Sequence, residues 1–240
     1  FAALHTRPTD GVPEIAFAIP IHHQAEMAVA AVASCLAQRG ASVEVLCVLD
    51  GGGVEVHDAL APFAADPRVR MFAYPKASGG AARGRNKAIL EACAPIVAFL
   101  DHDDLADPDR AALTLAALAR EGTQAVFGSW RARKEPGRSV EWVGDDEIWE
   151  PAPDAIANLE RTNGICLSTV AVERRALLSV GGFRARMHYR EDHELWLRLV
   201  ASGVTWSRIA EPLSTYRFHS GNTELRHTAG SALWHQLALD

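Results

Sequence analysis

A short apolar run that ends in a cluster of carboxylates is the feature that most restricts how this chain can fold. Residues 96–100 read Ile-Val-Ala-Phe-Leu, and residues 101–104 read Asp-His-Asp-Asp. A continuous, partly β-branched run of this length is typical of a strand that is buried on both faces. Open α/β folds bind their ligands at the sheet edge where such strands end. The run therefore predicts a buried strand that delivers its carboxylates to a ligand-binding edge.

These carboxylates need a reason to lie together, because like charges in close proximity repel one another. A hard divalent metal bridging to a phosphorylated ligand would account for the cluster. The alternative is a solvated acidic turn before a helix that Asp107 caps and Pro108 begins. That alternative explains Asp107, but it leaves Asp101, Asp103 and Asp104 unexplained.

The first half of the chain alternates short apolar strands with helices. We expect strands at 14–19, 43–49, 69–73, 96–100 and 125–130, and helices at 25–38, 55–65, 84–94 and 108–120. Strands and helices that alternate with short connections predict a mostly parallel sheet with helices on both faces. The expected fold class is therefore α/β.

The pattern changes after residue 130. Residues 131–153 are polar, contain tryptophans and are interrupted by proline and glycine, which indicates an antiparallel hairpin with loops. Beyond them we expect strands at 165–172, 206–209 and 213–217, helices at 174–180 and 191–201, and a C-terminal helix near 231–239. The chain thus divides into residues 1–130, residues 131–225 and a terminal segment, 226–240.

Composition excludes several classes of protein. The 240 residues are 48% hydrophobic, which suffices for one sizeable core, and the net charge of -6 without a basic block argues against a nucleic-acid partner. The four cysteines form no CxxC pair, which favours free thiols in a reducing compartment. No run approaches the ~20 apolar residues of a transmembrane helix, and the N-terminus lacks an apolar signal segment. We expect a cytoplasmic protein, with peripheral association at the inner face of a membrane left open.

Other features are expected at the same edge of the sheet. Pro20 and Ile21 follow the first strand, and Asp50 ends the second. Arg83 and Arg85 lie just before or within the helix that leads into the acidic strand, and their planar charged groups suit phosphate or base edges. The alternative for the two arginines is one exposed and one snorkelling side chain.

Six motifs in this order resemble those of the inverting GT-A glycosyltransferases of family 2. They are Ile19-Pro20-Ile21-His22-His23-Gln24, Leu49-Asp50-Gly51-Gly52, the segment 79–86 ending in Arg85-Asn86, Asp101-His102-Asp103-Asp104, Val180–Phe183 with Glu191–Arg198, and Tyr216-Arg217-Phe218-His219. The resemblance implies a GT-A fold, a Rossmann-like and mostly parallel sheet flanked by helices, with a small antiparallel acceptor-side portion. Residues 1–130 would bind the nucleotide sugar, and residues 131–225 would form the acceptor-binding and catalytic half.

The resemblance also implies which residues bind the donor. Asp50 would bind the nucleotide base, with Pro20, Ile21 and Arg85 lining the same pocket. Asp101 would orient the ribose or the sugar.

The remaining implied roles concern the metal and the reaction. Asp103 would hold Mn²⁺ or Mg²⁺ against the diphosphate, and His219 would add a ligand; its alternative is a surface or capping histidine. Asp192 would be the general base, with Glu191 in the substrate-binding set. The alternative for these two carboxylates is a pair that stabilises a helix N-terminus without catalysis.

The function implied is metal-dependent, inverting transfer of a sugar from a nucleotide-diphosphate sugar, with a UDP-sugar favoured. The acceptor would be a hydroxyl of a glycan, a lipid-linked molecule or a polysaccharide precursor. Leu49 stands where the family commonly has a second aspartate, which leaves the nucleotide open. Trp130, Trp142 and Trp149 either stack on a sugar ring or pack within the fold.

Two other functions are weighed against this one. A nucleotidyltransferase would need a glycine-rich, basic loop directly after the first strand, where this chain has Pro-Ile-His-His. A non-catalytic nucleotide- or sugar-binding module would bind the same ligands without turnover. A zinc site is disfavoured because the histidine spacing matches no usual zinc pattern.

Overall fold

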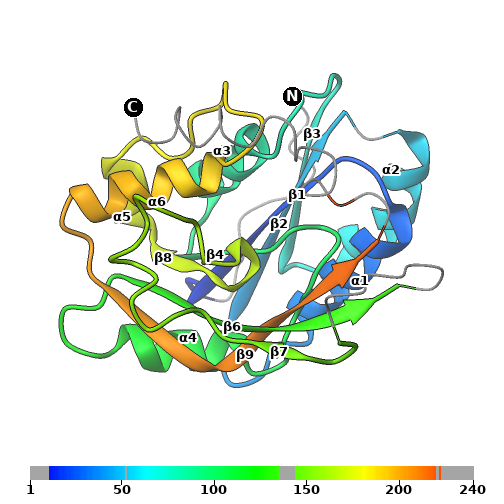
Figure 1. Cartoon of the computed structure of the whole chain (residues 1–240). Coiled ribbons are helices and arrows are strands. Elements are labelled where there is room, and N and C mark those ends of the chain that lie inside the picture. Colours follow the sequence, from blue (N-terminus) through cyan, green and yellow to red (C-terminus); the bar gives the residue numbers. More distant parts are fainter. Residues whose placement is uncertain (1–10, 52, 136–143, 220–221, 223–240) are drawn as a thin grey trace.

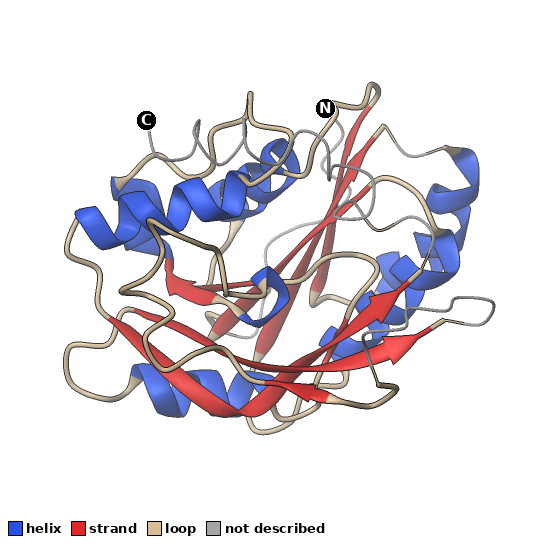
Figure 2. Ribbon diagram, in the orientation of Figure 1, coloured by secondary structure: helices blue, strands red, loops and turns tan. Residues whose placement is uncertain are grey.

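A nine-stranded sheet with helices on both faces forms the centre of the computed structural model, which describes residues 11–51, 53–135, 144–219 and 222 (Figures 1 and 2). Its strands are β1 (Ile15–Ile21), β2 (Val43–Asp50), β3 (Val69–Tyr74), β4 (Ile96–Phe99), β5 (Leu105–Ala106), β6 (Ala125–Lys134), β7 (Ile148–Trp149), β8 (Ala171–Glu173) and β9 (Trp206–Phe218). Its helices are α1 (Ala25–Leu36), α2 (Val54–Leu60), α3 (Ala82–Glu91), α4 (Arg110–Leu118), α5 (Arg174–Ser179) and α6 (Glu191–Ala201), with 3₁₀ helices at Ala61–Ala65 and Leu167–Thr169. The expected C-terminal helix and Trp142 lie outside the described residues.

The strand order is β3-β2-β1-β4-β8-β6-β9-β5, and β7 pairs with β6. The first four strands of this order are parallel, β8 runs antiparallel to both of its neighbours, and β6 is parallel to β9. The sheet therefore combines a parallel part with an antiparallel portion. This confirms the predicted α/β class.

Both faces of the parallel strands are buried, which explains why their sequences are apolar without interruption. On β1, Ile15, Phe17 and Ile19 enter one core, and Ala16 and Ala18 enter the other. Helices α1, α2 and α4 cover the first face, and α3, α5 and α6 cover the second (Figure 1). The carboxyl ends of the parallel strands meet at one edge, where the carboxylates were expected.

The strand expected at 165–172 was wrong. Residues 167–169 form a 3₁₀ helix, and only Ala171–Glu173 pairs as a strand, β8. The Thr169 hydroxyl donates to the Cys166 carbonyl at 2.8 Å, a local bond that competes with strand pairing. The apolar composition of this segment reflects burial rather than strand structure.

The two strands expected at 206–209 and 213–217 are one strand, β9. The register against β6 shifts between Gly128 and Trp130, and the unpaired Ala210 and Glu211 are exposed. Such a bulge lets a strand continue past a proline, here Pro212.

Asp107 does not occupy the N-cap position that was expected for it, and the residue that does, Asp109, makes no side-chain capping hydrogen bond. Helix α4 begins at Arg110 with Asp109 at its N-cap, and the Asp107 carboxylate accepts a hydrogen bond from the Asp109 backbone N–H at 3.2 Å.

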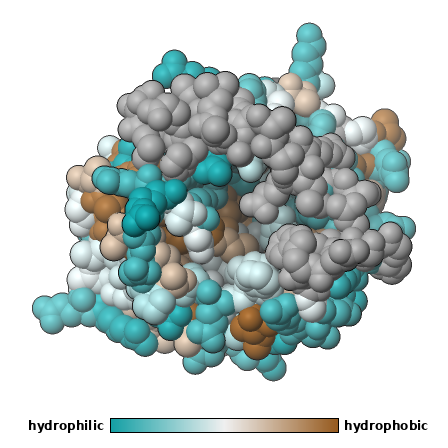
Figure 3. Space-filling view, viewed as in Figure 1, coloured by the Kyte–Doolittle hydropathy of each residue, from teal (hydrophilic) through white to brown (hydrophobic). Residues whose placement is uncertain are grey.

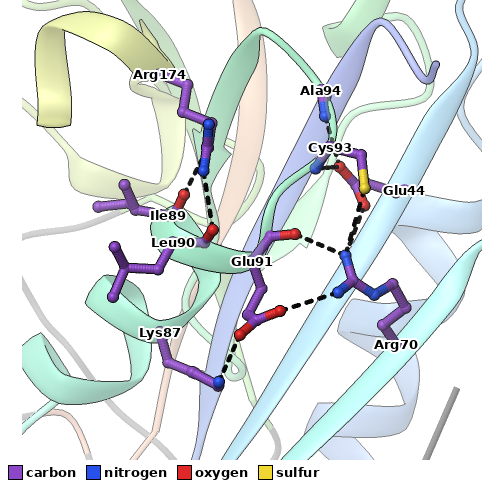
Figure 4. A network of polar contacts seen from close by, with 9 residues as sticks. All are labelled: Glu44, Arg70, Lys87, Ile89, Leu90, Glu91, Cys93, Ala94 and Arg174. Carbon is purple, nitrogen blue, oxygen red and sulfur yellow. Dashed lines mark hydrogen bonds and ion pairs between the residues drawn. The ribbon is translucent and has the colours of Figure 1, made fainter. Parts of the chain in front are cut away.

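A buried polar network fixes α3 against the opposite ends of the strands (Figure 4). Glu44, near the start of β2, accepts hydrogen bonds from the backbone N–H groups of Cys93 at 2.6 Å and Ala94 at 2.8 Å. Arg70 on β3 contacts both Glu44, at 3.5 Å, and Glu91 at the end of α3, at 3.1 Å. Because this network holds the C-terminal end of α3, the N-terminal end of the helix is presented to the ligand-binding edge.

Candidate active site

One cavity of about 720 Å³ lies at the carboxyl ends of β1, β2 and β4. On the face seen in Figure 3, apolar residues reach the surface near the centre, bordered by hydrophilic ones. The sequence-predicted site residues that line the cavity are Pro20, Ile21, Asp50, Arg85, Asp101, Asp103, Glu191 and Asp192. The remaining one, His219, bonds to Asp103, so the structure brings the whole predicted set together.

Asp50 ends β2 and is already fully engaged. Its Oδ2 accepts hydrogen bonds from the Ser78 backbone N–H at 3.0 Å and the Ser78 hydroxyl at 2.6 Å, and its Oδ1 accepts from two guanidinium nitrogens of Arg83. Burial raises the pKa of Asp50, but the Ser78 and Arg83 bonds outweigh it and hold the pKa below its usual value. A carboxylate has about four acceptor positions. A ligand N–H can therefore bond to the Asp50 carboxylate only if Arg83 or Ser78 first gives up a hydrogen bond to it.

Arg85 joins two carboxylates that are far apart in the sequence. Its Nη2 donates to Asp101 Oδ1 and its Nη1 to Glu191 Oε1, both at 2.6 Å, and its side chain is 4% exposed. Burial alone would lower the pKa of Arg85, yet the two carboxylates raise it above its usual value. Arg85 thus positions one acid at the end of β4 and another at the start of α6.

Asp103 faces His219, which follows β9. The Asp103 Oδ2 lies 2.9 Å from His219 Nε2, and the Asp103 carbonyl accepts a hydrogen bond from Arg217 Nε at 2.5 Å. The Nδ1 atom of His219 lies 2.8 Å from Gln24 Nε2. A carboxylate oxygen and an imidazole nitrogen suit Mn²⁺, and the oxygen suits Mg²⁺. The pair therefore fits the metal that the family resemblance implied.

Protein ligands alone do not complete such a site in the described part of the chain. Among those residues, no group of three or more His, Cys, Asp or Glu side chains is arranged to hold a metal ion. Metals that bind with phosphorylated substrates usually take one or two carboxylates and complete their coordination with phosphate and water. The Asp103–His219 pair matches that kind of site.

Asp104 has a structural role in the same turn. Its Oδ2 accepts the Ser168 hydroxyl at 2.5 Å and its Oδ1 accepts the Arg217 backbone N–H at 3.1 Å. Burial, with the charges of Asp103 and Asp101, raises the pKa of Asp104 well above its usual value. Asp104 therefore ties the acidic turn to β9 and to the 3₁₀ helix rather than to a ligand.

Asp192 lies in the first turn of α6, next to Glu191. Its Oδ2 accepts a hydrogen bond from Asn163 Nδ2 at 2.9 Å. Burial raises the pKa of Asp192, although hydrogen bonds from the His193 backbone and Asn163 and the charge of Arg85 oppose the shift. A carboxylate with a raised pKa that faces a cavity is suited to accept a proton.

Two aromatic side chains form part of the cavity wall. The rings of Trp130 on β6 and Trp149 on β7 stack at a centroid distance of 5.5 Å and an interplanar angle of 13°. Tyr216 packs against Trp130 at 5.5 Å, and all three residues line the cavity. Trp130 and Trp149 therefore pack against each other in the hairpin and also line the cavity.

Sequence reasoning missed the neutral partners of the charged residues. Ser78, Asn163 and Ser168 each bond to a site carboxylate, and Gln24 bonds to His219. They lie in loops or irregular turns and form no periodic or charged pattern. The only signal available was the position of Gln24 as the last residue of the first strand-end motif.

The fold and this site together define a GT-A glycosyltransferase domain. The chain belongs to glycosyl transferase family 2, whose family model matches residues 16–180. The match ends before Asp192 and His219, so the positions of these two side chains come from the structure.

Two curated relatives illustrate the similarity. The succinoglycan biosynthesis protein ExoO of Rhizobium meliloti is 32% identical over 139 residues, which are 58% of this chain and 39% of ExoO. An uncharacterized glycosyltransferase of Rickettsia felis is 26% identical over 208 residues, 87% of this chain and 33% of the relative. The chain thus spans between a third and two fifths of the length of these relatives.

Solved structures show the same fold at low sequence identity. S. aureus TarS 1-349 in complex with UDP-GlcNAc has a TM-score of 0.70 at 14% identity, covering 87% of this chain and 60% of the TarS chain. The mannosyltransferase PcManGT from Pyrobaculum calidifontis, in complex with GDP-Man and Mn²⁺, has a TM-score of 0.66 at 16% identity, covering 92% and 61%. None of the helices within the described residues has the length and apolar character needed to cross a membrane.

Proposed function

We propose that this domain transfers a sugar from a nucleotide-diphosphate sugar to an acceptor hydroxyl, with metal assistance and inversion at the anomeric carbon. The observation that carries the proposal is the cavity that both Asp103, which bonds to His219, and the separate carboxylate Asp192 line. Residues 1–130 would bind the donor, and residues 131–225 would bind the acceptor and supply the base.

A UDP-sugar is the favoured donor. TarS was solved with UDP-GlcNAc and PcManGT with GDP-Man and Mn²⁺, so both neighbours bind nucleotide sugars on this fold. In this chain Asp103 and His219 would hold Mn²⁺ or Mg²⁺ beside the diphosphate. The metal, when bound, acts as a Lewis acid that stabilises the charge on the departing nucleoside diphosphate.

The reaction is a single displacement. The acceptor oxygen forms a bond to the anomeric carbon while the bond from that carbon to the diphosphate oxygen breaks, and the electron pair of the broken bond leaves with the nucleoside diphosphate. Asp192 takes the proton of the acceptor hydroxyl, with Asn163 holding its carboxylate in place. Arg85 orients Asp101 and Glu191, which contact the donor.

The acceptor would carry a sugar, because Trp130 and Trp149 offer aromatic surface in the cavity wall. The name of ExoO, a succinoglycan biosynthesis protein, supports a polysaccharide precursor or lipid-linked sugar as the acceptor class. We also propose a cytoplasmic location, since all four cysteines are free thiols.

The test is a transfer assay with Mn²⁺, a panel of nucleotide sugars and oligosaccharide acceptors, with the anomeric configuration of the product determined by NMR. We expect inversion, and a loss of transfer of about 10²–10⁴-fold in Asp192→Asn with UDP and Mn²⁺ binding retained. Asp154→Asn, which changes an exposed aspartate in the same way, is the matched control and should retain wild-type activity.

Two results would contradict the proposal. Transfer by Asp192→Asn at the wild-type rate would remove Asp192 as the base, and a product with retained configuration would remove the single displacement. Metal-dependent nucleotide binding without turnover on any acceptor would favour the non-catalytic binding module instead.

A further inference from the structure

Gln24 connects the first strand-end turn to the last residues of the described chain. It lies between β1 and α1 with φ 57° and ψ 62°, the left-handed conformation that residues other than glycine rarely adopt. In this conformation the side chain reaches His219, 195 positions away in the sequence, and places Nε2 2.8 Å from His219 Nδ1. Non-glycine residues in such a conformation concentrate at functional sites.

The amide orientation of Gln24 corresponds to one tautomer of the His219 imidazole. With Gln24 Nε2 as the donor, His219 Nδ1 is the acceptor. A neutral ring in this arrangement carries its proton on Nε2, which lies 2.9 Å from Asp103 Oδ2. In this tautomer the nitrogen that faces Asp103 has no lone pair for a metal.

Metal binding by His219 requires the opposite tautomer. If Nε2 coordinates a metal beside Asp103, the proton moves to Nδ1, and Nδ1 then needs an acceptor. Gln24 carries that acceptor on the same amide, because its Oε1 is buried and has no hydrogen-bond partner in the part of the chain that the structure describes. Turning the amide by half a revolution exchanges the donor at Nδ1 for the acceptor.

We propose that Gln24 is a positioning residue that supports His219 in both tautomers, donating to Nδ1 without metal and accepting from Nδ1 when Nε2 coordinates the metal. This rests on the proposed function, in which Asp103 and His219 hold the metal. A neutral amide suits this role because it has a donor and an acceptor end, whereas a carboxylate accepts only and an apolar side chain does neither.

The direct test follows the imidazole nitrogens of the ¹⁵N-labelled full chain by long-range ¹H–¹⁵N NMR, with His219→Gln used to assign the signal. Without metal we expect a proton on Nε2. After addition of UDP with Zn²⁺, a diamagnetic ion that binds imidazole nitrogen, we expect the proton on Nδ1. The same tautomer in both states would overturn the proposal.

A second measurement compares Mn²⁺ affinity, by calorimetry in the presence of UDP at pH 8, in Gln24→Met and Gln24→Glu. Methionine has a similar size without hydrogen bonding, and we expect its affinity to fall about 10-fold to 100-fold, as for other residues that orient a metal ligand. Glutamate accepts from Nδ1, so we expect it to keep affinity within about threefold of wild type. Wild-type affinity in Gln24→Met, or equal losses in both variants, would contradict a role through the His219 proton.

His219→Ala separates this proposal from the proposed function. If His219→Ala leaves Mn²⁺ affinity unchanged, His219 is not a ligand, and both its metal role and the role of Gln24 are wrong. If His219→Ala weakens binding and Gln24→Met does not, only the role of Gln24 is wrong. If both weaken binding, the double variant should lose no more than His219→Ala alone, because Gln24 acts through that histidine. Should Gln24→Met fail to fold, the NMR measurement on the wild-type chain decides.

Discussion

At the scale of single residues, the acidic turn shows how three identical side chains acquire different roles from their contacts. Asp101 bonds to Arg85, Asp103 faces His219, and Asp104 is enclosed by Ser168 and the Arg217 backbone. The Arg85 cation offsets the charge of Asp101, while burial and the charges of Asp103 and Asp101 raise the pKa of Asp104.

Asparagine substitutions separate two of these roles. We expect Asp103→Asn to weaken Mn²⁺ binding at least about 10-fold, because a charged ligand is lost. Asp104→Asn should retain Mn²⁺ binding, since its amide can accept from the Arg217 N–H and donate to the Ser168 hydroxyl. Calorimetry on both variants checks this, and equal losses would contradict the division of the turn.

Comparison of the wild type with Asp104→Asn also predicts how the stability of the fold depends on pH. The pKa of Asp104 is raised in the folded chain, so its contribution to stability is present below the unfolded-state pKa and is lost as pH rises through the folded-state pKa. Melting temperatures measured across pH should therefore fall for the wild type relative to Asp104→Asn as the solution becomes more basic. A constant difference between the two proteins would show that Asp104 does not titrate in this range.

Asn163 is one of three groups that oppose the raised pKa of Asp192, the proposed base. Its hydrogen bond lowers the pKa of Asp192 against the larger effect of burial. A base must be ionised, so activity is lost as pH falls through this pKa. We expect Asn163→Ala to move the acidic limb of kcat/KM to higher pH, with the KM for the donor little changed. An unshifted limb with a uniformly lower rate would mean that Asn163 only positions the acceptor.

At the scale of elements, the Glu44 network determines how firmly α3 is held. In Glu44→Ala, the N–H groups of Cys93 and Ala94 lose their acceptor and Arg70 loses one of its carboxylates. Breaking a buried ion pair on one side destabilises a protein by about 3–5 kcal/mol. We expect the free energy of unfolding to fall by an amount near the lower end of this range, because Arg70 keeps its ion pair with Glu91. Urea unfolding measures the change. Glu121→Ala, at an exposed loop position, is the control and should change stability by less than about 0.5 kcal/mol.

Elements whose sequence pattern fits one kind of secondary structure could be predicted from the sequence. Elements whose sequence pattern fits more than one could not. The strands from 14 to 100 were located closely because burial on both faces makes them continuously apolar. The segment 165–172 was misread because apolar composition does not distinguish a buried 3₁₀ turn from a strand. Two strands were expected at 206–209 and 213–217, while pairing with β6 over both parts makes them one strand.

The candidate site follows the same rule. Asp50, Asp101 and Asp103 could be predicted because strand ends fix where they lie, whereas Glu191 and Asp192, in the first turn of α6, were expected from the family resemblance. Their neutral partners could not, since Asn163 meets Asp192 across 29 positions and Gln24 meets His219 across 195, with no local pattern to mark either contact.

At the scale of the whole molecule, Arg85 couples the two halves of the domain. It connects Asp101, at the end of a parallel strand, to Glu191, at the start of the helix that carries Asp192. The elements proposed to bind the donor and to carry the base are thereby fixed to one buried cation. The charge of Arg85 also lowers the pKa of Asp192.

Removing this charge should disturb both halves at once. In Arg85→Gln the two carboxylates lose their shared cation, and we expect a loss of about 3–5 kcal/mol in unfolding free energy. The pKa of Asp192 should rise further, so the acidic limb of kcat/KM moves to higher pH. The thermal stabilisation by UDP with Mn²⁺ should also shrink, since Asp101 is no longer held.

Arg39→Gln is the matched control. It removes an arginine from an exposed pair with Asp109, in which the side chains are 66% and 52% exposed. Exposed pairs contribute about 0–1 kcal/mol, so this variant should leave stability, the pH profile and the UDP response nearly unchanged. If Arg85→Gln behaved like Arg39→Gln in all three measurements, the Arg85 ion pairs would not couple the two halves, and the proposed base and donor site would titrate independently.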